Sequence, residues 1–341
     1  MRRFAALLTT AFLFAATFAP AEESKPAAEL LTFAGRTMGT VYSVKFLQPA
    51  ARVAVEQARR EVGVRLDRLE QAMSTYREDS EVCRFGAYRG GDWFAVSADT
   101  ACVVAESLRV SELTGGAFDV TVDPLVRLWG FGPRRETGEP PAEQAIAETR
   151  CKVDWRKLQV RLHPPALRKM SPEISVDLSA IAKGYAADVI AGCLEKLGAT
   201  KCLVAIGGEL KALGHGQQGR PWRVGVDKPL DDGRTIQRVI ELKDKAISTS
   251  GDYRNFFTDD GRRYSHVMDP RTGRPVTHNL ASVTIVADTS ARADALATGL
   301  MVLGPDVGYT LAVKRGWPCL FILRSGDGFV EKPTPTFEKL R

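Results

Sequence analysis

Residues 177–208 read DLSAIAKGYAADVIAGCLEKLGATKCLVAIGG and predict a helix followed by a strand and a tight turn. The apolar residues over 181–197 predict a helix, and Gly198 is the residue type that commonly ends one. The short apolar run at 202–206 predicts a strand. The double glycine at 207–208 then predicts a turn.

The start of this helix carries groups that suit an anion. Asp177, several small residues and the pair Lys183-Gly184 lie just before the helix or in its first turn. A helix N-terminus favours negative charge, small residues let a ligand approach the backbone, and Lys183 adds a positive charge suited to phosphate. The alternative is a lysine on a tightly packed helix start. The P-loop pattern G-x-x-x-x-G-K-[ST] is missing.

The elements on either side of this stretch are short and mixed in type. Strands and helices are interspersed without a strict βαβ rhythm, which favours an α+β fold with a mixed or antiparallel sheet. We expect helices at 51–73, 98–113 and 291–303, a loop at 132–142, and strands at 39–47, 222–226, 238–242, 246–249, 282–287 and 319–323, the last of these being the final strand.

The composition is that of an ordinary folded protein. The chain has 341 residues, of which 44% are apolar, 26% charged and 8% aromatic. These values exclude a disordered tail, a collagen-like repeat and a disulfide-dense miniprotein. The net charge of +6 is mild, and no run of like charges marks a nucleic-acid or membrane patch. We therefore expect no nucleic acid among the partners.

The segment 1–21 has the order of a secretory signal peptide. Two arginines precede an almost uncharged stretch at 4–18, and small residues follow it. A membrane anchor is the alternative, but the apolar run of about 15 residues is shorter than the roughly 20 that span a bilayer. We expect cleavage near Ala21, a tether at 22–31, and a single exported, periplasmic domain at 32–341 without a membrane span. The arginine pair leaves the export route, general secretory or twin-arginine, open.

The six cysteines lack the spacing of a metal site. No pair is C-x-x-C, and no histidine lies at zinc-finger spacing from them. Disulfides in an oxidising compartment and buried free thiols are both compatible with the sequence. Their pairing cannot be read from it.

Three further side chains are candidates for chemistry. Asp294 and Thr298 are four residues apart on a predicted helix and so share one face, where their hard oxygens suit Mg²⁺. An acid near a helix start can equally complement the helix dipole. Among the four histidines, His266, beside Ser265 and near Asp269, is the best candidate for a general base. Neither G-x-G-x-x-G nor G-x-S-x-G is present, which disfavours a Rossmann site and an α/β serine hydrolase.

Taken in order along the chain, these segments closely resemble one family, the FAD:protein FMN transferases, also called ApbE flavin transferases. The resemblance covers about residues 36–304, most of the chain. Gly86 and Ala205 depart from the pattern, since the family commonly has Asn at both positions. The matching segments are 37–40 (TMGT), 73–76 (MSTY) with 80–81, 116–119 (GAFD) with 129–132 (WGFG), 177–188, 207–208, 248–253, 264–273 and 293–298 (ADALAT).

The resemblance implies a two-lobed α+β architecture, related to the T-fold, with FAD in a cleft between the lobes. It implies Mg²⁺ held by the backbone carbonyl of Ala180 and the side chains of Asp294 and Thr298. His266 resembles the base proposed for the family, and we expect Asp269 to assist it. The residues expected to line the FAD site are Met38, Tyr76, Ala117, Phe118, Asp119, Asp177, Lys183 and Val267.

The activity that the resemblance implies is transfer of FMN from FAD to a Thr or Ser hydroxyl of an acceptor protein, with release of AMP. The family's acceptors resemble flavin-bearing subunits of membrane redox complexes. Mg²⁺ and Lys183 would neutralise charge on the pyrophosphate, and Tyr76 or Phe118 would stack on a flavin or adenine ring. One alternative is an FAD pyrophosphatase, with water as acceptor and FMN and AMP as products. Another is a non-enzymatic flavin-binding assembly factor, against which the general base argues because binding alone needs none.

Overall fold

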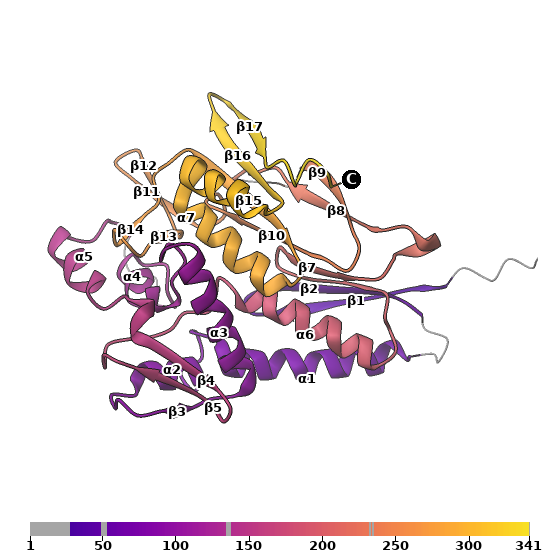
Figure 1. Ribbon diagram of the computed structural model, residues 1–341, viewed down its shortest axis with the longest axis horizontal. Helices are drawn as coiled ribbons and strands as arrows, with labels where there is room; N and C mark the ends of the chain where they lie inside the picture. Colours follow the sequence, from indigo (N-terminus) through magenta and orange to yellow (C-terminus); the bar gives the residue numbers. More distant parts are fainter. Residues whose placement is uncertain (1–27, 49–52, 134–137, 232, 234, 341) are drawn as a thin grey trace, which may run out of the picture.

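The computed structural model describes residues 28–48, 53–133, 138–231, 233 and 235–340 (Figure 1). The predicted signal peptide at 1–21 and part of the predicted loop at 132–142 lie outside the described residues. The first strand begins at Leu30, so the predicted tether at 22–31 overlaps it by two residues.

An antiparallel sheet of eight strands forms the centre of the molecule. Its order is β1-β2-β6-β7-β10-β15-β16-β17, and each neighbouring pair is antiparallel. The α+β class is confirmed, with the antiparallel form of the sheet. The strands are β1 (Leu30–Thr37), β2 (Thr40–Leu47), β6 (Cys202–Ile206), β7 (Glu209–Leu213), β10 (Ala246–Gly251), β15 (Leu280–Ala287), β16 (Cys319–Ser325) and β17 (Gly328–Pro333).

Strand β17 corrects one expectation, because the strand at 319–323 is not the final one. β16 continues to Ser325, turns at a glycine with positive φ, Gly326, and pairs with β17 along its whole length. The sequence of β17 gives little indication of a strand, because the segment includes Glu331, Lys332 and Pro333 and none of its residues is buried.

Helices α1, α6 and α7 pack on one face of the sheet, and α3 packs on α1 and α7. Val44 and Phe46 of β2 point into this layer and are fully buried, as are Leu69 of α1 and Ile190 of α6. Each such side chain contributes about 1.5–3 kcal/mol of burial free energy. The helices are α1 (Val55–Met73), α3 (Ala98–Leu113), α6 (Ala182–Lys196) and α7 (Ser290–Arg315).

Helix α7 is longer than the helix expected at 291–303. It continues through a kink at Gly304, where φ is 80°, and Pro305. Proline cannot donate the backbone hydrogen bond of a regular helix, which explains the break. By length and composition alone, α7 is long and apolar enough to cross a membrane. Half of its most apolar window is buried inside the protein, as in a core helix.

A two-stranded ribbon covers the opposite face of the sheet. It consists of β8 (Trp222–Asp227) and β9 (Ile236–Leu242), which pair antiparallel. Val224 and Ile240 pack with Ile322 of the sheet in a second hydrophobic cluster. The large sheet is therefore buried on both faces over much of its area.

A group of smaller elements lies beside the sheet. Leu125, Trp129, Ile146 and Met268 form a third hydrophobic cluster, whereas Phe85, Leu158 and Leu167 belong to the same core as the large sheet and its helices. The ring of Trp129 stacks on that of Tyr264, with centroids 5.6 Å apart, and so joins a helix end to a hairpin. The elements are α2 (Glu81–Ala87), β3 (Phe94–Ala95), α4 (Asp123–Leu128), α5 (Glu143–Arg150), β4 (Leu158–Leu162), β5 (Pro165–Lys169), β11 (Phe256–Asp259), β12 (Arg262–Ser265), β13 (Met268–Asp269) and β14 (Arg274–Pro275).

All six cysteines are free thiols. Of the two alternatives left open by the sequence, the structure therefore shows unpaired cysteines. Only two of them are buried, and burial raises their pKa. The six are Cys83, Cys102, Cys151, Cys193, Cys202 and Cys319, of which the last two are buried.

Candidate functional site

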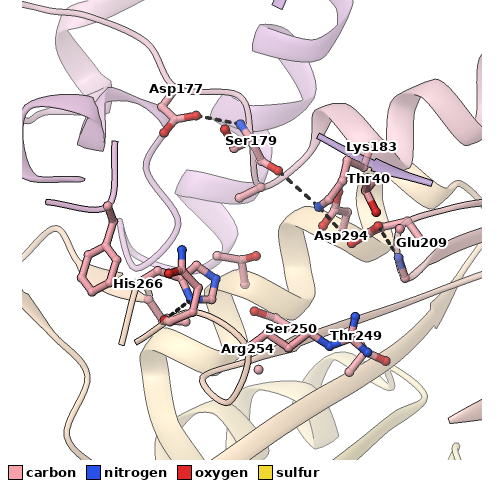
Figure 2. A pocket seen from close by; sticks show the side chains of 18 of the residues that line it. Thr40, Asp177, Ser179, Lys183, Glu209, Thr249, Ser250, Arg254, His266 and Asp294 are labelled. Atoms are coloured by element: carbon pink, nitrogen blue, oxygen red, sulfur yellow. Dashed lines mark hydrogen bonds and ion pairs between the residues drawn. The ribbon is translucent and has the colours of Figure 1, made fainter. Parts of the chain in front are cut away.

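A cavity of about 670 Å³ lies between the large sheet and the smaller elements. Figure 2 shows Lys183, Asp294 and Glu209 on one side of it and His266 across from them. Two predicted site residues, Met38 and Asp269, are not among those that line it. The structure brings together all the others, which are Tyr76, Ala117, Phe118, Asp119, Asp177, Ala180, Lys183, His266, Val267, Asp294 and Thr298.

The N-termini of α6 and α7 meet at the back of the cavity. Gly184 donates its backbone N–H to Oδ2 of Asp294 at 3.1 Å. A Cβ at Gly184 would lie 2.3 Å from the carbonyl oxygen of Ser290, so only glycine allows this approach. One turn later, the Asp188 carboxylate accepts the N–H groups of Ser290 and Ala291 and caps α7. The Lys-Gly pair in the sequence therefore marks a contact between two helix starts.

Lys183 extends from the first turn of α6 into the cavity. Its Nζ donates to Oε1 of Glu209 at 3.1 Å, and Glu209 also accepts the N–H of Gly208. Burial alone would lower the pKa of Lys183, but the Asp294 and Glu209 carboxylates outweigh it and hold the pKa above its usual value. Lys183 is therefore a fixed positive charge beside two buried carboxylates.

Asp294 is a buried acid whose charged form is disfavoured by its surroundings. Only 5% of its surface is exposed, and burial raises its pKa to about 7, although Lys183 acts in the opposite direction. A carboxylate destabilised in this way is stabilised by a bound cation.

The groups around Asp294 fit Mg²⁺. Ala180 and Thr298 line the same cavity, so a carbonyl, a carboxylate and a hydroxyl oxygen are available. Mg²⁺ prefers hard oxygen ligands and takes few from the protein. The described residues contain no cluster of three or more His, Cys, Asp or Glu that could hold a metal ion.

His266 lies just after strand β12 and enters the cavity from the hairpin side. Its backbone N–H and its Nδ1 both contact the carbonyl oxygen of Asn255, at 3.0 and 3.1 Å. A carbonyl can only accept, so Nδ1 carries the proton and Nε2 is left with its lone pair. Burial lowers the pKa of His266, which favours this neutral form. The ring packs edge-on against Phe131, with centroids 6.5 Å apart.

Tyr76, Phe118 and Asp119 also line the cavity. Tyr76 is 69% exposed and offers a ring face, whereas Phe118 is only 2% exposed and packs in the core. Of the two rings considered for stacking, Tyr76 is thus the accessible one. Asp119 accepts hydrogen bonds from Thr121 and Trp155, and burial raises its pKa to about 6.

The two residues outside the cavity have other contacts. Met38 lies at the tight turn between β1 and β2 with φ of 47°, and its N–H donates to Glu70. The Asp269 carboxylate accepts from the backbone N–H, Nε and Nη2 of Arg271, each at 2.9 Å. These bonds occupy the carboxylate, whereas the ring contact of His266 is with the Asn255 carbonyl.

Several cavity residues were not identified from the sequence. Glu209 follows the double glycine, which we interpreted only as a turn. Asn255 acts through its backbone carbonyl, which no side-chain pattern reveals. The segment 248–253, which was noted in the sequence only as part of the resemblance, supplies Thr249 and Ser250 to the cavity wall.

The chain is similar to known proteins of one family. The ApbE family model matches residues 38–321. An FAD:protein FMN transferase of Vibrio cholerae is 40% identical over 338 residues, which cover 99% of this chain and 98% of the relative. The FAD:protein FMN transferase of Escherichia coli K12 is 39% identical, covering 98% and 95%.

A solved structure of the flavin transferase ApbE from Vibrio cholerae aligns with a TM-score of 0.85 at 41% identity. The alignment covers 92% of this chain and 100% of that one. The shared fold and the identity of about 40% over nearly the whole chain lead to one assignment. The chain belongs to the ApbE family, and its activity is that of an FAD:protein FMN transferase.

Proposed function

We propose that this enzyme uses Mg²⁺ to transfer FMN from FAD to a Thr or Ser hydroxyl of an acceptor protein, with release of AMP. FAD would occupy the cavity between the sheet and the smaller elements. The observation that carries the proposal is the placement, in one cavity, of an oxygen donor set around the buried Asp294, a fixed lysine and a neutral histidine.

The backbone carbonyl of Ala180 and the side chains of Asp294 and Thr298 would hold the metal. When bound, Mg²⁺ supplies charge neutralisation on the pyrophosphate oxygens. Lys183 would add a second positive charge for the same phosphates. Tyr76, with its exposed ring at the cavity wall, would stack on an aromatic ring of FAD.

His266 would act as the general base. Its Nε2 lone pair would accept the proton of the acceptor hydroxyl as that oxygen bonds to the phosphorus of the FMN half. The bond from this phosphorus to the bridging oxygen breaks, and AMP leaves with that oxygen. Asp269 stays a predicted assistant of His266, and its bonds to Arg271 would limit it to an indirect role through the β13 turn.

We also propose that the protein works outside the cytoplasm on flavin-bearing subunits of a membrane redox complex. The support is the signal-peptide pattern at 1–21 and the resemblance to a family whose acceptors resemble flavin-bearing subunits of membrane redox complexes. Fractionation of cells that express the full chain tests the location. Recovery of uncleaved protein in the cytoplasm would contradict it.

The test of the reaction uses purified protein, FAD, Mg²⁺ and a candidate acceptor domain. Intact mass of the acceptor and release of AMP are measured with and without EDTA. We expect the acceptor to gain one FMN, with equal AMP, and both to be lost in EDTA. AMP without acceptor labelling would instead indicate the pyrophosphatase.

His266→Ala separates the base from the binding site. We expect it to retain FAD binding and to transfer FMN roughly 100-fold or more slowly. The matched control is His163→Ala, an exposed histidine outside the cavity, which should transfer at the wild-type rate. An unchanged rate in His266→Ala would remove this residue from the mechanism.

A further inference from the structure

The hairpin that carries His266 is not part of the large sheet. Strands β11 and β12 pair only with each other among the described strands. His266 follows β12 directly, and its ring nitrogen is oriented by the carbonyl of Asn255, which directly precedes β11. The position of the histidine thus depends on whatever holds the ends of this hairpin.

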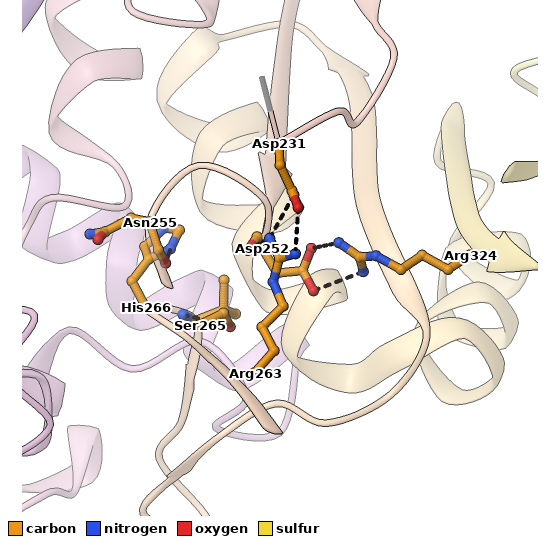
Figure 3. A network of polar contacts seen from close by, with 8 residues as sticks. Asp231, Asp252, Asn255, Arg263, Ser265, His266 and Arg324 are labelled. Atoms are coloured by element: carbon orange, nitrogen blue, oxygen red, sulfur yellow. Dashed lines mark hydrogen bonds and ion pairs between the residues drawn. The ribbon is translucent and has the colours of Figure 1, made fainter. Parts of the chain in front are cut away.

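Arg263 of β12 makes the contacts that hold these ends. Its guanidinium donates to both carboxylate oxygens of Asp231, at 3.1 and 2.9 Å, and to the backbone carbonyl of Asp252 at 3.0 Å (Figure 3). The guanidinium carbon also lies 3.5 Å from the ring centroid of Phe256. Phe256 is the residue next to Asn255, so Arg263 contacts the chain on both sides of that carbonyl.

Asp252 connects this arrangement to the large sheet. Its carboxylate accepts two hydrogen bonds from the guanidinium of Arg324 on β16, at 2.9 and 2.6 Å (Figure 3). Its backbone N–H donates to the carbonyl of Ala281 on β15. Only 7% of Asp252 is exposed. A bidentate guanidinium–carboxylate pair fixes orientation as well as distance, which gives Arg263 a rigid point of attachment.

We propose that Arg263 is a positioning residue for His266: it holds the segment 252–256 so that the Asn255 carbonyl selects the Nδ1-protonated tautomer and leaves Nε2 free to accept a proton. Which imidazole nitrogen carries the proton is decided by the hydrogen bond that the other makes. Without Arg263, the Phe256 ring and the Asp252 carbonyl lose a shared contact, and the Asn255 carbonyl can move away from Nδ1.

The test compares Arg263→Gln with Arg262→Gln. Arg262 is the neighbouring residue on the same strand, is exposed, and lies over the Tyr264 ring instead of the Asp252 network. Imidazole ¹⁵N chemical shifts report the His266 tautomer directly at a pH where the ring is neutral, and His266→Ala assigns the signal among the four histidines. FMN transfer kcat, the KM for FAD and the melting temperature are measured on the same samples.

We expect a single Nδ1–H tautomer in the wild type and in Arg262→Gln, and a mixture in Arg263→Gln. Transfer kcat should fall about tenfold in Arg263→Gln with an unchanged KM for FAD, since a loosened group loses its productive geometry. Arg263→Lys keeps the charge but not the planar guanidinium group. The fraction of Nδ1–H tautomer in this variant should therefore lie between the fractions in the wild type and in Arg263→Gln. If Arg263→Gln fails to fold, Asp231→Asn, which leaves Arg263 in place without its ion pair, should shift the tautomer in the same direction.

The rate effect rests on the proposed role of His266 as base, whereas the tautomer effect does not. A pure Nδ1–H tautomer in Arg263→Gln and in Asp231→Asn would overturn the positioning role. A shifted tautomer with wild-type kcat would support the positioning role and count against His266 as the base.

Discussion

The two sides of the cavity are built by different means. On one side, Lys183, Gly184 and Asp294 come from the first turns of two packed helices and are fixed by backbone contacts. On the other side, His266 comes from a small hairpin that is fixed by side-chain ion pairs and stacked rings. The helical side holds buried charge, and the hairpin side holds a neutral base.

The difference follows from the requirements of each group. A buried carboxylate and a lysine need an environment that cannot relax, and helix termini in direct contact supply one. A base that must meet the hydroxyl of a second protein needs access, which loops and hairpins at a surface provide. On the helical side, changes in side-chain volume and charge should therefore have the largest effect on stability and transfer. On the hairpin side, the loss of single hydrogen bonds should matter.

The largest effect is expected for Asp294→Asn. This variant removes the charged ligand of the proposed metal site, and transfer should fall roughly 100-fold or more. Thermal unfolding with and without Mg²⁺ should show a stabilising shift in the wild type and none in the variant. Normal flavinylation by the variant would show that Asp294 holds no essential metal.

The same variant tests how far the buried charge of Asp294 destabilises the folded protein. Burial raises the pKa of Asp294 from 3.8 to about 7, so the folded state binds this proton more tightly than the unfolded state does. Metal-free wild-type protein should lose stability relative to Asp294→Asn as the pH rises from about 4 to about 7. Melting temperatures of both proteins in EDTA at pH 5 and pH 8 measure the difference. Equal changes in the two would contradict the raised pKa.

The next largest effect is expected for Gly184→Ala, which should lower the stability of the fold. The added Cβ would lie 2.3 Å from the Ser290 carbonyl oxygen, so α6 and α7 must separate. We expect a loss of about 2–3 kcal/mol in the free energy of unfolding, measured by denaturant titration. Gly192→Ala on the same helix has open space around its Cβ and serves as the control. An unaffected Gly184→Ala would mean that the helix starts are not in tight contact.

On the hairpin side, Trp129→Phe removes one buried hydrogen bond. Nε1 of Trp129 donates to the carbonyl of Gly273 at 2.9 Å. The variant keeps an aromatic ring against Tyr264 but leaves that carbonyl without its donor, at a cost of about 1–3 kcal/mol. We expect a lower melting temperature and slower transfer, with unchanged stabilisation by Mg²⁺. A loss of the Mg²⁺ effect would show that the two sides are coupled.

The smallest effect is expected for Arg254→Gln. Arg254 pairs with Asp227 at 2.9 Å, but the two side chains are 49% and 29% exposed. Exposed ion pairs contribute about 0–1 kcal/mol, and salt screens them. Melting temperatures in low and high salt should differ little between the variant and the wild type. A large loss would mean that this pair also holds the hairpin side.

Much of the fold could be predicted from the sequence where the pattern was strong. Helix α3 at 98–113 and strand β6 at 202–206 have the predicted bounds. The hairpins β11–β12 and β13–β14 were missed because their strands are only four and two residues long and carry no alternating apolar pattern. The second half of α7 was missed because Gly304-Pro305 is a local signal for a helix end.

The order of the motifs along the chain is specific, so it is sufficient to predict the family and eleven of the residues that line the cavity. How these residues act depends on contacts between segments that are distant in the sequence. Gly184 and Asp294 are 110 positions apart and meet through the packing of two helices. Glu209 joins Lys183 across 26 positions, and Asp269 is turned toward Arg271. Local sequence sets helix and strand preferences, but contacts between distant side chains depend on how the elements pack, and that is decided by the whole core.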